Sequence, residues 1–328
     1  IAPSSCDRPF DRFAMTPTTS TEGMRGKKPS PTVGVVLVGL AYIAIVTRLS
    51  MPSLQEYFDR SHTCMERKTG HLDAVLLRRL FPWAVQMCSI SDRLHIEPFT
   101  NSDETKYFIM PVKPEGEVCS IVSLGIGFDV DSELLLKTAM PHCDFYGADP
   151  INKTNADIFQ KVGKFFNIAV GGKNGTLEAM VLEGKDEHMN GLYYNRKVPY
   201  MDLATFFRKY LPGRRIIDLL IIDIEHAEYE MLPLLLNDGQ QALDGIAICQ
   251  INIEVHNPSE EEMKLFWNFH QKVLAERRFS MLITSTIIGH TRLFMIDRSQ
   301  PSCLDRFFDG HRYSSGGKSI DESIRTKN

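Results

Sequence analysis

Between residues 119 and 297, short apolar runs alternate with segments in which apolar side chains recur every three or four positions. The runs predict buried strands, and the second pattern predicts helices that each bury one face. Such alternation is typical of a mostly parallel sheet covered by helices on both faces. We expect strands at 119–125, 143–148, 165–170, 216–223 and 246–254, then a closing pair near 280–287 and 291–297. The expected helices lie at about 130–139, 154–161, 201–210, 227–237 and 260–277.

The two closing strands follow each other with no helix between them, which predicts an antiparallel hairpin at the sheet edge. The chain before the sheet is less regular. Residues 72–83 have helical spacing, which we expect to end at Pro82. A short strand is expected near 107–111, after a turn-like segment at 98–103. The patterns predict one α/β domain over 93–312, preceded by a stem or accessory helix at 48–92.

Both ends of the chain differ from this domain. Residues 1–30 and 313–328 are polar and lack periodicity, so we expect disordered tails there. Residues 31–47 are uncharged and follow Arg25, Lys27 and Lys28. This length is near the lower limit of about 17 residues for a membrane span. We expect an uncleaved signal anchor, with a secretory signal segment and a buried helix as alternatives. The basic residues would keep 1–30 cytosolic and place the domain in the Golgi or endoplasmic reticulum lumen, or outside the cell if the segment is cleaved.

Composition limits the possible partners. The 328 residues are 43% hydrophobic and 24% charged, with a net charge of −4, so no overall basic field points to nucleic acid.

The seven cysteines have no zinc-site spacing. We expect Cys119, Cys143 and Cys249 to be free thiols in or beside buried strands. Cys64, Cys88 and Cys303 are freer to pair in an oxidising compartment. Glycosylation sequons at Asn152 and Asn174 agree with exposure to the lumen.

The strand at 119–125 ends in two glycines spaced one residue apart, Gly125 and Gly127, and a helical pattern follows. Such a strand–turn–helix unit forms a crevice where open α/β sheets bind nucleotide-like ligands. About 20 residues further on, Asp149 ends the next strand, at the distance of an acid that binds ribose hydroxyls. Val130 replaces the third glycine of the dinucleotide motif, which favours an adenosyl ligand without a pyrophosphate. A turn that binds no ligand is the alternative.

A second group of polar residues follows the strand at 216–223. Asp223 stands at its end, where it could hold a ligand, a metal or a substrate hydroxyl, or cap a helix. Glu225 and His226 follow it and could form an acid–base pair.

The strand at 246–254 is unusual for a central strand, because polar side chains alternate with apolar ones. These polar residues are Gln250, Asn252, Glu254 and His256. Their shared face predicts a site, at least at its Glu254 and His256 end. The alternative is a buried hydrogen-bond network.

These residues together resemble a known family. The chain is similar to class I S-adenosylmethionine-dependent methyltransferases of the FkbM type, and more narrowly to a nematode-expanded family related to methyltransferase-like protein 24. The resemblance runs from about residue 98 to about residue 308. It rests on the motifs at 124–127 with Asp129 and Glu133, 146–150, 166–171, 198–202, 222–228 and 249–256. It implies a Rossmann-like three-layer sandwich with a mostly parallel seven-stranded sheet.

The resemblance also implies roles for single residues. Gly125 and Gly127 would lie against the methionine part of S-adenosylmethionine, with Ser123 and Asp129 beside them. Asp149, next to Pro150, would bind the ribose, and Ala169 would border the adenine. Asp223 would lie near the transferred methyl, with Glu225, His226 and His256 as further candidate bases. Two departures stand out: Ser123 replaces an acid, and His226 replaces a glycine.

The expected function is therefore methyl transfer, with an O-linked small-molecule or glycan acceptor in the secretory pathway. No residue is assigned as a metal ligand, and metal dependence stays open. Two other functions remain open. A Golgi-type glycosyltransferase would use Asp129 and Asp131 as a metal-binding Asp-x-Asp pair. A non-catalytic domain that keeps the fold would explain Ser123 and His226. The sequence leaves the acceptor and the oligomeric state undefined.

Overall fold

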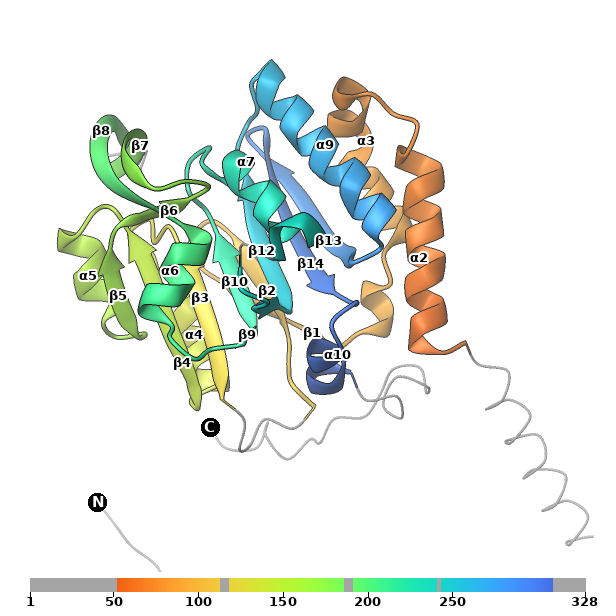
Figure 1. The fold of residues 1–328 in the computed structure, drawn as a ribbon, viewed down its shortest axis with the longest axis horizontal. Helices are drawn as coiled ribbons and strands as arrows, with labels where there is room; N and C mark the ends of the chain where they lie inside the picture. Colours follow the sequence, from red (N-terminus) through yellow and green to blue (C-terminus); the bar gives the residue numbers. More distant parts are fainter. Residues whose placement is uncertain (1–51, 113–117, 186–190, 241–242, 309–328) are drawn as a thin grey trace, which may run out of the picture. The chain divides into compact units, whose positions relative to one another are not determined.

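The computed structural model describes residues 52–112, 118–185, 191–240 and 243–308. Its centre is a seven-stranded sheet with the strand order β13-β14-β12-β10-β3-β4-β5 (Figure 1). The strands are β3 (Cys119–Leu124), β4 (Cys143–Asp149), β5 (Lys164–Asn167), β10 (Leu219–Ile222), β12 (Gln250–Val255), β13 (Phe279–Ile287) and β14 (His290–Asp297). Neighbours from β12 to β5 are parallel, and β14 is antiparallel to both β12 and β13. The predicted mostly parallel sheet is confirmed. β14 lies inside the sheet, so only β13 of the closing pair is an edge strand.

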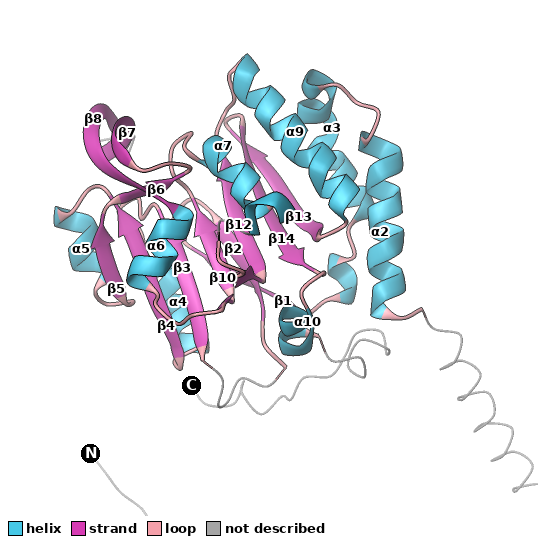
Figure 2. Ribbon diagram, viewed as in Figure 1, coloured by secondary structure: helices cyan, strands magenta, loops and turns pink. Residues whose placement is uncertain are grey.

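Two hydrophobic clusters cover opposite faces of this sheet, which makes three layers (Figure 2). Successive strand residues point to opposite faces. Thus Leu220 and Ile222 belong to one cluster, and Leu219 and Ile221 belong to the other. The first face is covered by α3 (Ala74–Cys88), α6 (Leu203–Tyr210), α7 (Glu228–Met231) and α9 (Glu260–Glu276). The second is covered by α4 (Asp131–Ala139), α5 (Lys153–Phe159) and α10 (Pro301–Phe307).

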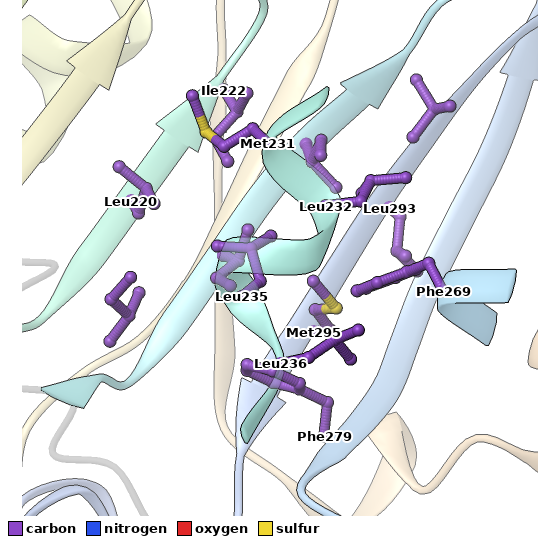
Figure 3. Packing of buried hydrophobic residues seen from close by; sticks show 14 of the residues in the cluster. Leu220, Ile222, Met231, Leu232, Leu235, Leu236, Phe269, Phe279, Leu293 and Met295 are labelled. Atoms are coloured by element: carbon purple, nitrogen blue, oxygen red, sulfur yellow. The ribbon is translucent and has the colours of Figure 1, made fainter. Parts of the chain in front are cut away.

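The helix expected at 227–237 is broken into three pieces. α7 is followed by a 3₁₀ turn, η2 (Leu232–Leu235), and by α8 (Asn237–Gln240). Pro233 accounts for the break, because it lacks the backbone donor that a continuing helix needs. Leu232 and Leu235 still pack against the sheet (Figure 3).

Residues 48–92, expected to form a stem or an accessory helix, contain α2 (Leu54–Thr69) and α3, packed into the same body as the sheet. α3 continues beyond Pro82, where we expected it to end. Phe81, Val85 and Cys88 are buried in the core on either side of the proline. Burying three such side chains contributes more than the roughly 3 kcal/mol that an interior proline costs.

A hairpin of β1 (Ile96–Thr100) and β2 (Thr105–Ile109) packs against β12, although residues 98–103 were expected to be only a turn. Asn252 accepts from the Tyr107 N–H at 2.9 Å and donates to the Tyr107 carbonyl at 2.8 Å. Gln250 binds the backbone of Ile109 in the same way, at 2.7 and 3.0 Å. Two side-chain amides of β12 therefore make the backbone hydrogen bonds to β2 that a second neighbouring strand would make.

The region between β5 and α6 forms a three-stranded sheet of its own, in the order β6-β8-β7. Its strands are β6 (Ala169–Gly171), β7 (Gly175–Lys185) and β8 (Gly191–Asp202). The single strand expected at 165–170 is therefore two strands, β5 and β6, in different sheets. Short strands β9 (Ile216–Ile217) and β11 (Ala247–Ile248) likewise form a separate parallel pair.

Three disulfide bonds connect Cys64 to Cys88, Cys119 to Cys143, and Cys249 to Cys303. The expectation that Cys119, Cys143 and Cys249 are free thiols was wrong. Cys119 and Cys143 begin adjacent strands and are register partners, which brings their side chains within bonding reach. Burial alone does not distinguish a thiol from a disulfide.

No helix among the described residues is long and apolar enough to cross a membrane. The expected anchor at 31–47 and both expected disordered tails lie outside those residues.

Candidate active site

The glycine turn lies at the carboxyl end of β3, between β4 and β10. Gly125 and Gly127 have φ values of +80° and +62°, which glycine adopts without strain. The Gly125 N–H donates to the Ala148 carbonyl at 2.9 Å. A Cβ on Gly125 would lie 1.7 Å from the Asp223 carbonyl oxygen, whereas a Cβ on Gly127 would meet nothing within 4 Å. Gly125 is thus required for packing, and Gly127 leaves one side of the turn open.

Asp149 is nearly buried beneath this turn. Its Oδ2 accepts from the Ile126 N–H at 2.9 Å, and its Oδ1 accepts from the Ile151 N–H at 2.7 Å. Burial raises the pKa of Asp149, and these donors act against that shift. Asn155 supports the same turn by accepting from the Phe128 N–H at 3.0 Å. The predicted ribose acid therefore adjoins the glycine turn and also holds its shape.

The other predicted cofactor residues lie around this point. Pro150 follows Asp149, and its carbonyl accepts from the Asn167 side chain at 2.8 Å. Ala169 is buried in β6. Asp129 accepts from the Ser102 N–H at 3.1 Å and from the Asp131 N–H at 2.9 Å, so its carboxylate ties the β1–β2 turn to the start of α4.

Ser123 is fully buried and donates to Glu133 at 3.1 Å. Glu133 is also 3.0 Å from the ammonium of Lys106, which lies 3.2 Å from Glu104. Burial opposes the charge of Lys106, but the two carboxylates raise its pKa, and Lys106 in turn lowers the pKa of Glu133. Ser123 therefore belongs to a buried ion-pair network below the glycine turn.

Three predicted catalytic residues come together beyond the ends of β10 and β12. His256 Nε2 lies 3.2 Å from Glu225 Oε2 and 3.5 Å from Asp223 Oδ1. On the other side of the ring, His256 Nδ1 lies 2.9 Å from Oε1 of the fully buried Glu228. Burial opposes protonation, but the bonds to Glu225 and Glu228 and the neighbouring charges raise the pKa of His256 to about 11. Glu228 was not singled out from the sequence as a site residue.

Asp223 keeps 37% of its side-chain surface exposed and is one of the residues that line a pocket. Loss of solvent around the carboxyl raises the pKa of Asp223 well above its usual range. The negative charge of Glu254 raises this pKa further, and His256 acts against the shift. A narrow pocket adjoins Asp223 and is lined also by Glu254, Arg292 and Glu104. Arg292 donates to Glu254 at 2.6 Å, and His290 Nδ1 lies 3.2 Å from the other oxygen of Glu254.

The polar face of β12 thus has two functions. Its Gln250 and Asn252 half binds the β1–β2 hairpin, as the buried-network alternative held, and its Glu254 and His256 half lines the site.

His226, the fourth predicted catalytic residue, is bonded to a different element. Its Nδ1 lies 2.9 Å from Glu262 at the start of α9, and its ring centroid is 5.5 Å from that of His256. Its φ of +73° is in the left-handed region, where glycine is favoured. This backbone conformation is a physical reason for the glycine that the FkbM pattern, as stated in the sequence analysis, has at position 226.

Tyr193 on β8 is a site residue that sequence reasoning missed. It hydrogen-bonds to Glu225, while 46% of its surface remains exposed. Burial and the charge of Glu225 raise its pKa. The aromatic pair Tyr193 and Tyr194 could have indicated a strand. Its position beside Glu225 depends on how the β7–β8 ribbon folds back, which no local pattern shows.

The geometry accordingly joins a glycine turn, an acid at the next strand end and a carboxylate–histidine group along one sheet edge. The family model of the methyltransferase FkbM domain matches residues 83–298. The chain belongs to the FkbM methyltransferase family. The match spans the glycine turn, Asp149, Asp223 and His256 of this FkbM domain. No curated protein matches the chain.

Proposed function

We propose that this FkbM domain is an S-adenosylmethionine-dependent enzyme that methylates a hydroxyl oxygen of a small-molecule or glycan acceptor. The observation that carries the proposal is the contact between Gly125 and the backbone of Asp223. It supports the proposal because the glycine turn, our candidate for the cofactor site, adjoins a residue whose carboxylate lines a pocket.

The residues present fit the cofactor. The open side of Gly127 offers space for the backbone to approach the methionine part. Asp149 ends β4 against the glycine turn, where its carboxylate would meet the ribose hydroxyls. Ala169 offers a small apolar surface to the adenine. These assignments are our predictions for this chain.

When bound, the cofactor supplies a methyl group already activated by its sulfonium. The chain must align an acceptor hydroxyl with that methyl and take its proton. An O–CH₃ bond forms, the S–CH₃ bond breaks, and S-adenosylhomocysteine leaves. We assign the proton to the carboxylate of Asp223, which lines the pocket. Both nitrogens of His256 are engaged, so it serves as a positioning residue.

The acceptor side is formed in part by β8. Tyr193 and Tyr194 are about half exposed, and Tyr193 bonds to Glu225. An exposed aromatic face next to carboxylates is suited to an acceptor that carries both C–H and hydroxyl groups, as a sugar does. This supports a glycan acceptor.

We further propose an oxidising compartment, because the three disulfide bonds persist where thiols are not kept reduced. A lumenal domain behind the 31–47 segment would meet this condition. Asn152 is exposed and could be glycosylated there, whereas the Asn174 amide is bonded to Asp202.

The glycosyltransferase alternative has less support. The Asp129 carboxylate already accepts hydrogen bonds from the backbone of Ser102 and Asp131. The family match also points to methyl transfer.

The test is calorimetric titration of the purified, oxidised chain with S-adenosylhomocysteine, followed by transfer of labelled methyl from the cofactor into extracts. We expect binding, and a loss of transfer of about 10²-fold or more in Asp223→Asn with binding kept. Glu230→Gln, on the exposed side of α7, is the control and should transfer normally. Absence of binding at about 1 mM ligand would reject the enzyme and leave a non-catalytic domain.

A further inference from the structure

We infer that Asp223, Glu225 and His256 form a binding site for a divalent cation of the Mn²⁺ or Zn²⁺ type. Each of the three residues offers one ligand atom, and these atoms all lie within 4.8 Å of one another. This site goes beyond methyl transfer, which needs no metal for the reaction itself.

The spacing of these atoms matches a coordination sphere. Ligand atoms held at about 2.1 Å from one cation lie roughly 3.0 Å apart in octahedral geometry and roughly 3.4 Å apart in tetrahedral geometry. The distances from His256 Nε2 are 3.2 Å to Glu225 and 3.5 Å to Asp223. Neither carboxylate needs to move far for one ion to contact all three atoms.

Glu228 provides an independent indication. Its side chain is fully buried, and its Oε1 accepts from the His256 backbone N–H at 2.8 Å and contacts His256 Nδ1 at 2.9 Å. Its Oε2 is buried and has no hydrogen-bond partner among the described residues. Carboxylates that bind the second nitrogen of a metal-ligating histidine fix its tautomer and raise its basicity. With its Nδ1 proton directed at Glu228, His256 points Nε2 at two carboxylates, where that nitrogen holds either a proton or a cation.

A lone pair that faces two carboxylate oxygens is repulsive unless a cation or a proton lies between them. The surrounding charge increases this demand. Four carboxylates converge here, those of Asp223, Glu225, Glu228 and Glu254. Of these, Glu254 is paired with the guanidinium of Arg292. The group remains negative even with a protonated His256, so a divalent ion balances it better than one proton does.

A second set of ligands overlaps the first. Glu254, His256 and His290 also offer atoms within 4.8 Å of one another. His290 Nδ1 is buried and makes no hydrogen bond within the part of the chain that is described, although it lies 3.2 Å from Glu254. β12, β14 and the loop after β10 therefore direct two imidazoles and three carboxylates at one place. Mixed imidazole and carboxylate ligands favour Mn²⁺ or Zn²⁺ over Mg²⁺.

A cation at this site would change how the acceptor is held. The open coordination positions would bind the acceptor hydroxyl and make it more acidic, and Asp223 could still take the proton on its second oxygen. This consequence depends on the proposed function, but the binding of the ion does not.

The experiment measures metal binding, independently of turnover. Oxidised full-length chain is freed of metal with a chelator and titrated with Mn²⁺, and bound ion is measured by electron paramagnetic resonance and calorimetry. Zn²⁺ and Mg²⁺ are titrated in parallel. We expect one tight Mn²⁺ or Zn²⁺ per chain. Glu225→Gln should lower its affinity at least tenfold, and Glu228→Gln about 10–100-fold through the loss of support for His256.

The matched control is His95→Gln, which changes a half-exposed histidine that pairs with Glu97 instead. It should bind the ion as the unaltered chain does. Circular dichroism melting checks the folding of each variant, and Glu225→Gln changes a half-buried side chain that tolerates the substitution sterically. No Mn²⁺ or Zn²⁺ binding at about 1 mM, or equal affinity in Glu225→Gln, would overturn the site and leave His256 as a protonated counter-ion. Binding of S-adenosylhomocysteine, measured on the same samples, tests the proposed function separately.

Discussion

The backbone carbonyl oxygen of Asp223 occupies the space that a side chain on Gly125 would need, since a Cβ there would lie 1.7 Å from it. Two loops from neighbouring strands, β3 and β10, are thereby locked together. The Asp223 N–H adds to this contact by donating to the Leu124 carbonyl at 2.9 Å. The glycine turn and the carboxylate site cannot move independently.

Gly125→Ala should therefore destabilise the fold by roughly 3 kcal/mol or more, because backbone must shift and the φ of +80° is unfavourable for alanine. Gly127→Ala is the control. It has a similar φ but open space around its Cβ, and should cost only about 1–2 kcal/mol. Urea denaturation measures both. Equal losses in the two variants would show that the Asp223 contact has no energetic weight.

Lys106→Met should destabilise the chain by about 3–5 kcal/mol, because it leaves the buried carboxylate of Glu133 without its charge partner. Adding Glu133→Gln should restore part of that loss. Lys173→Met, which breaks an exposed pair with Glu230, should cost less than about 1 kcal/mol. Denaturation midpoints distinguish these cases, and a small effect at Lys106 would mean that water reaches the network.

His226→Gly should be more stable than His226→Ala by about 1 kcal/mol, because only glycine relieves the left-handed backbone. Both variants lose the contact with Glu262, so the comparison isolates the backbone. Thermal melting of the pair tests this. If alanine were as stable as glycine, the strain at φ +73° would be negligible.

The free energy of unfolding should decrease as the pH is lowered, because His270 is buried in its uncharged form. Its Nε2 lies 2.8 Å from Thr69 Oγ1, which itself donates to the Met65 carbonyl, so Nε2 carries the proton and Nδ1 is bare. Burial lowers the pKa of His270 from 6.5 to about 4. The unfolded chain therefore takes up a proton below pH 6.5 that the folded chain refuses. Stability should decline between pH 6.5 and 4, by roughly 3 kcal/mol in total.

The variant His270→Phe lacks this titration, so its unfolding free energy should depend less on pH in that interval. His62, whose pKa burial also lowers, contributes equally to both proteins. Denaturation at several pH values gives the difference in slope. Parallel curves would show that His270 is protonated in the folded chain.

Much of the sheet could be predicted from the sequence, because β10 is wholly apolar and β3 is mostly so. The site edge followed from where those strands end. The backbone conformation at position 226 could not be predicted. The sequence showed a histidine in place of a glycine, and only the positive φ shows that a side chain is unfavourable there. Contacts between distant segments left no local pattern. Asn252 pairs with Tyr107 across 145 positions, and Tyr193 meets Glu225 because of how a ribbon folds back. The partners of Cys119 and Cys249 depended likewise on strand register and on the placement of α10.

Two of the disulfide bonds described above have a mechanical consequence. Cys119–Cys143 joins the first residues of β3 and β4, and Cys249–Cys303 fastens the start of β12 to α10. These are the ends of the strands opposite to the site. Covalent restraint is therefore concentrated at one end of the sheet, while the loops at the other end are held by hydrogen bonds and packing. Stiffness should decrease along each of these strands, which leaves the ligand-facing loops free to adjust while the base of the sheet stays rigid.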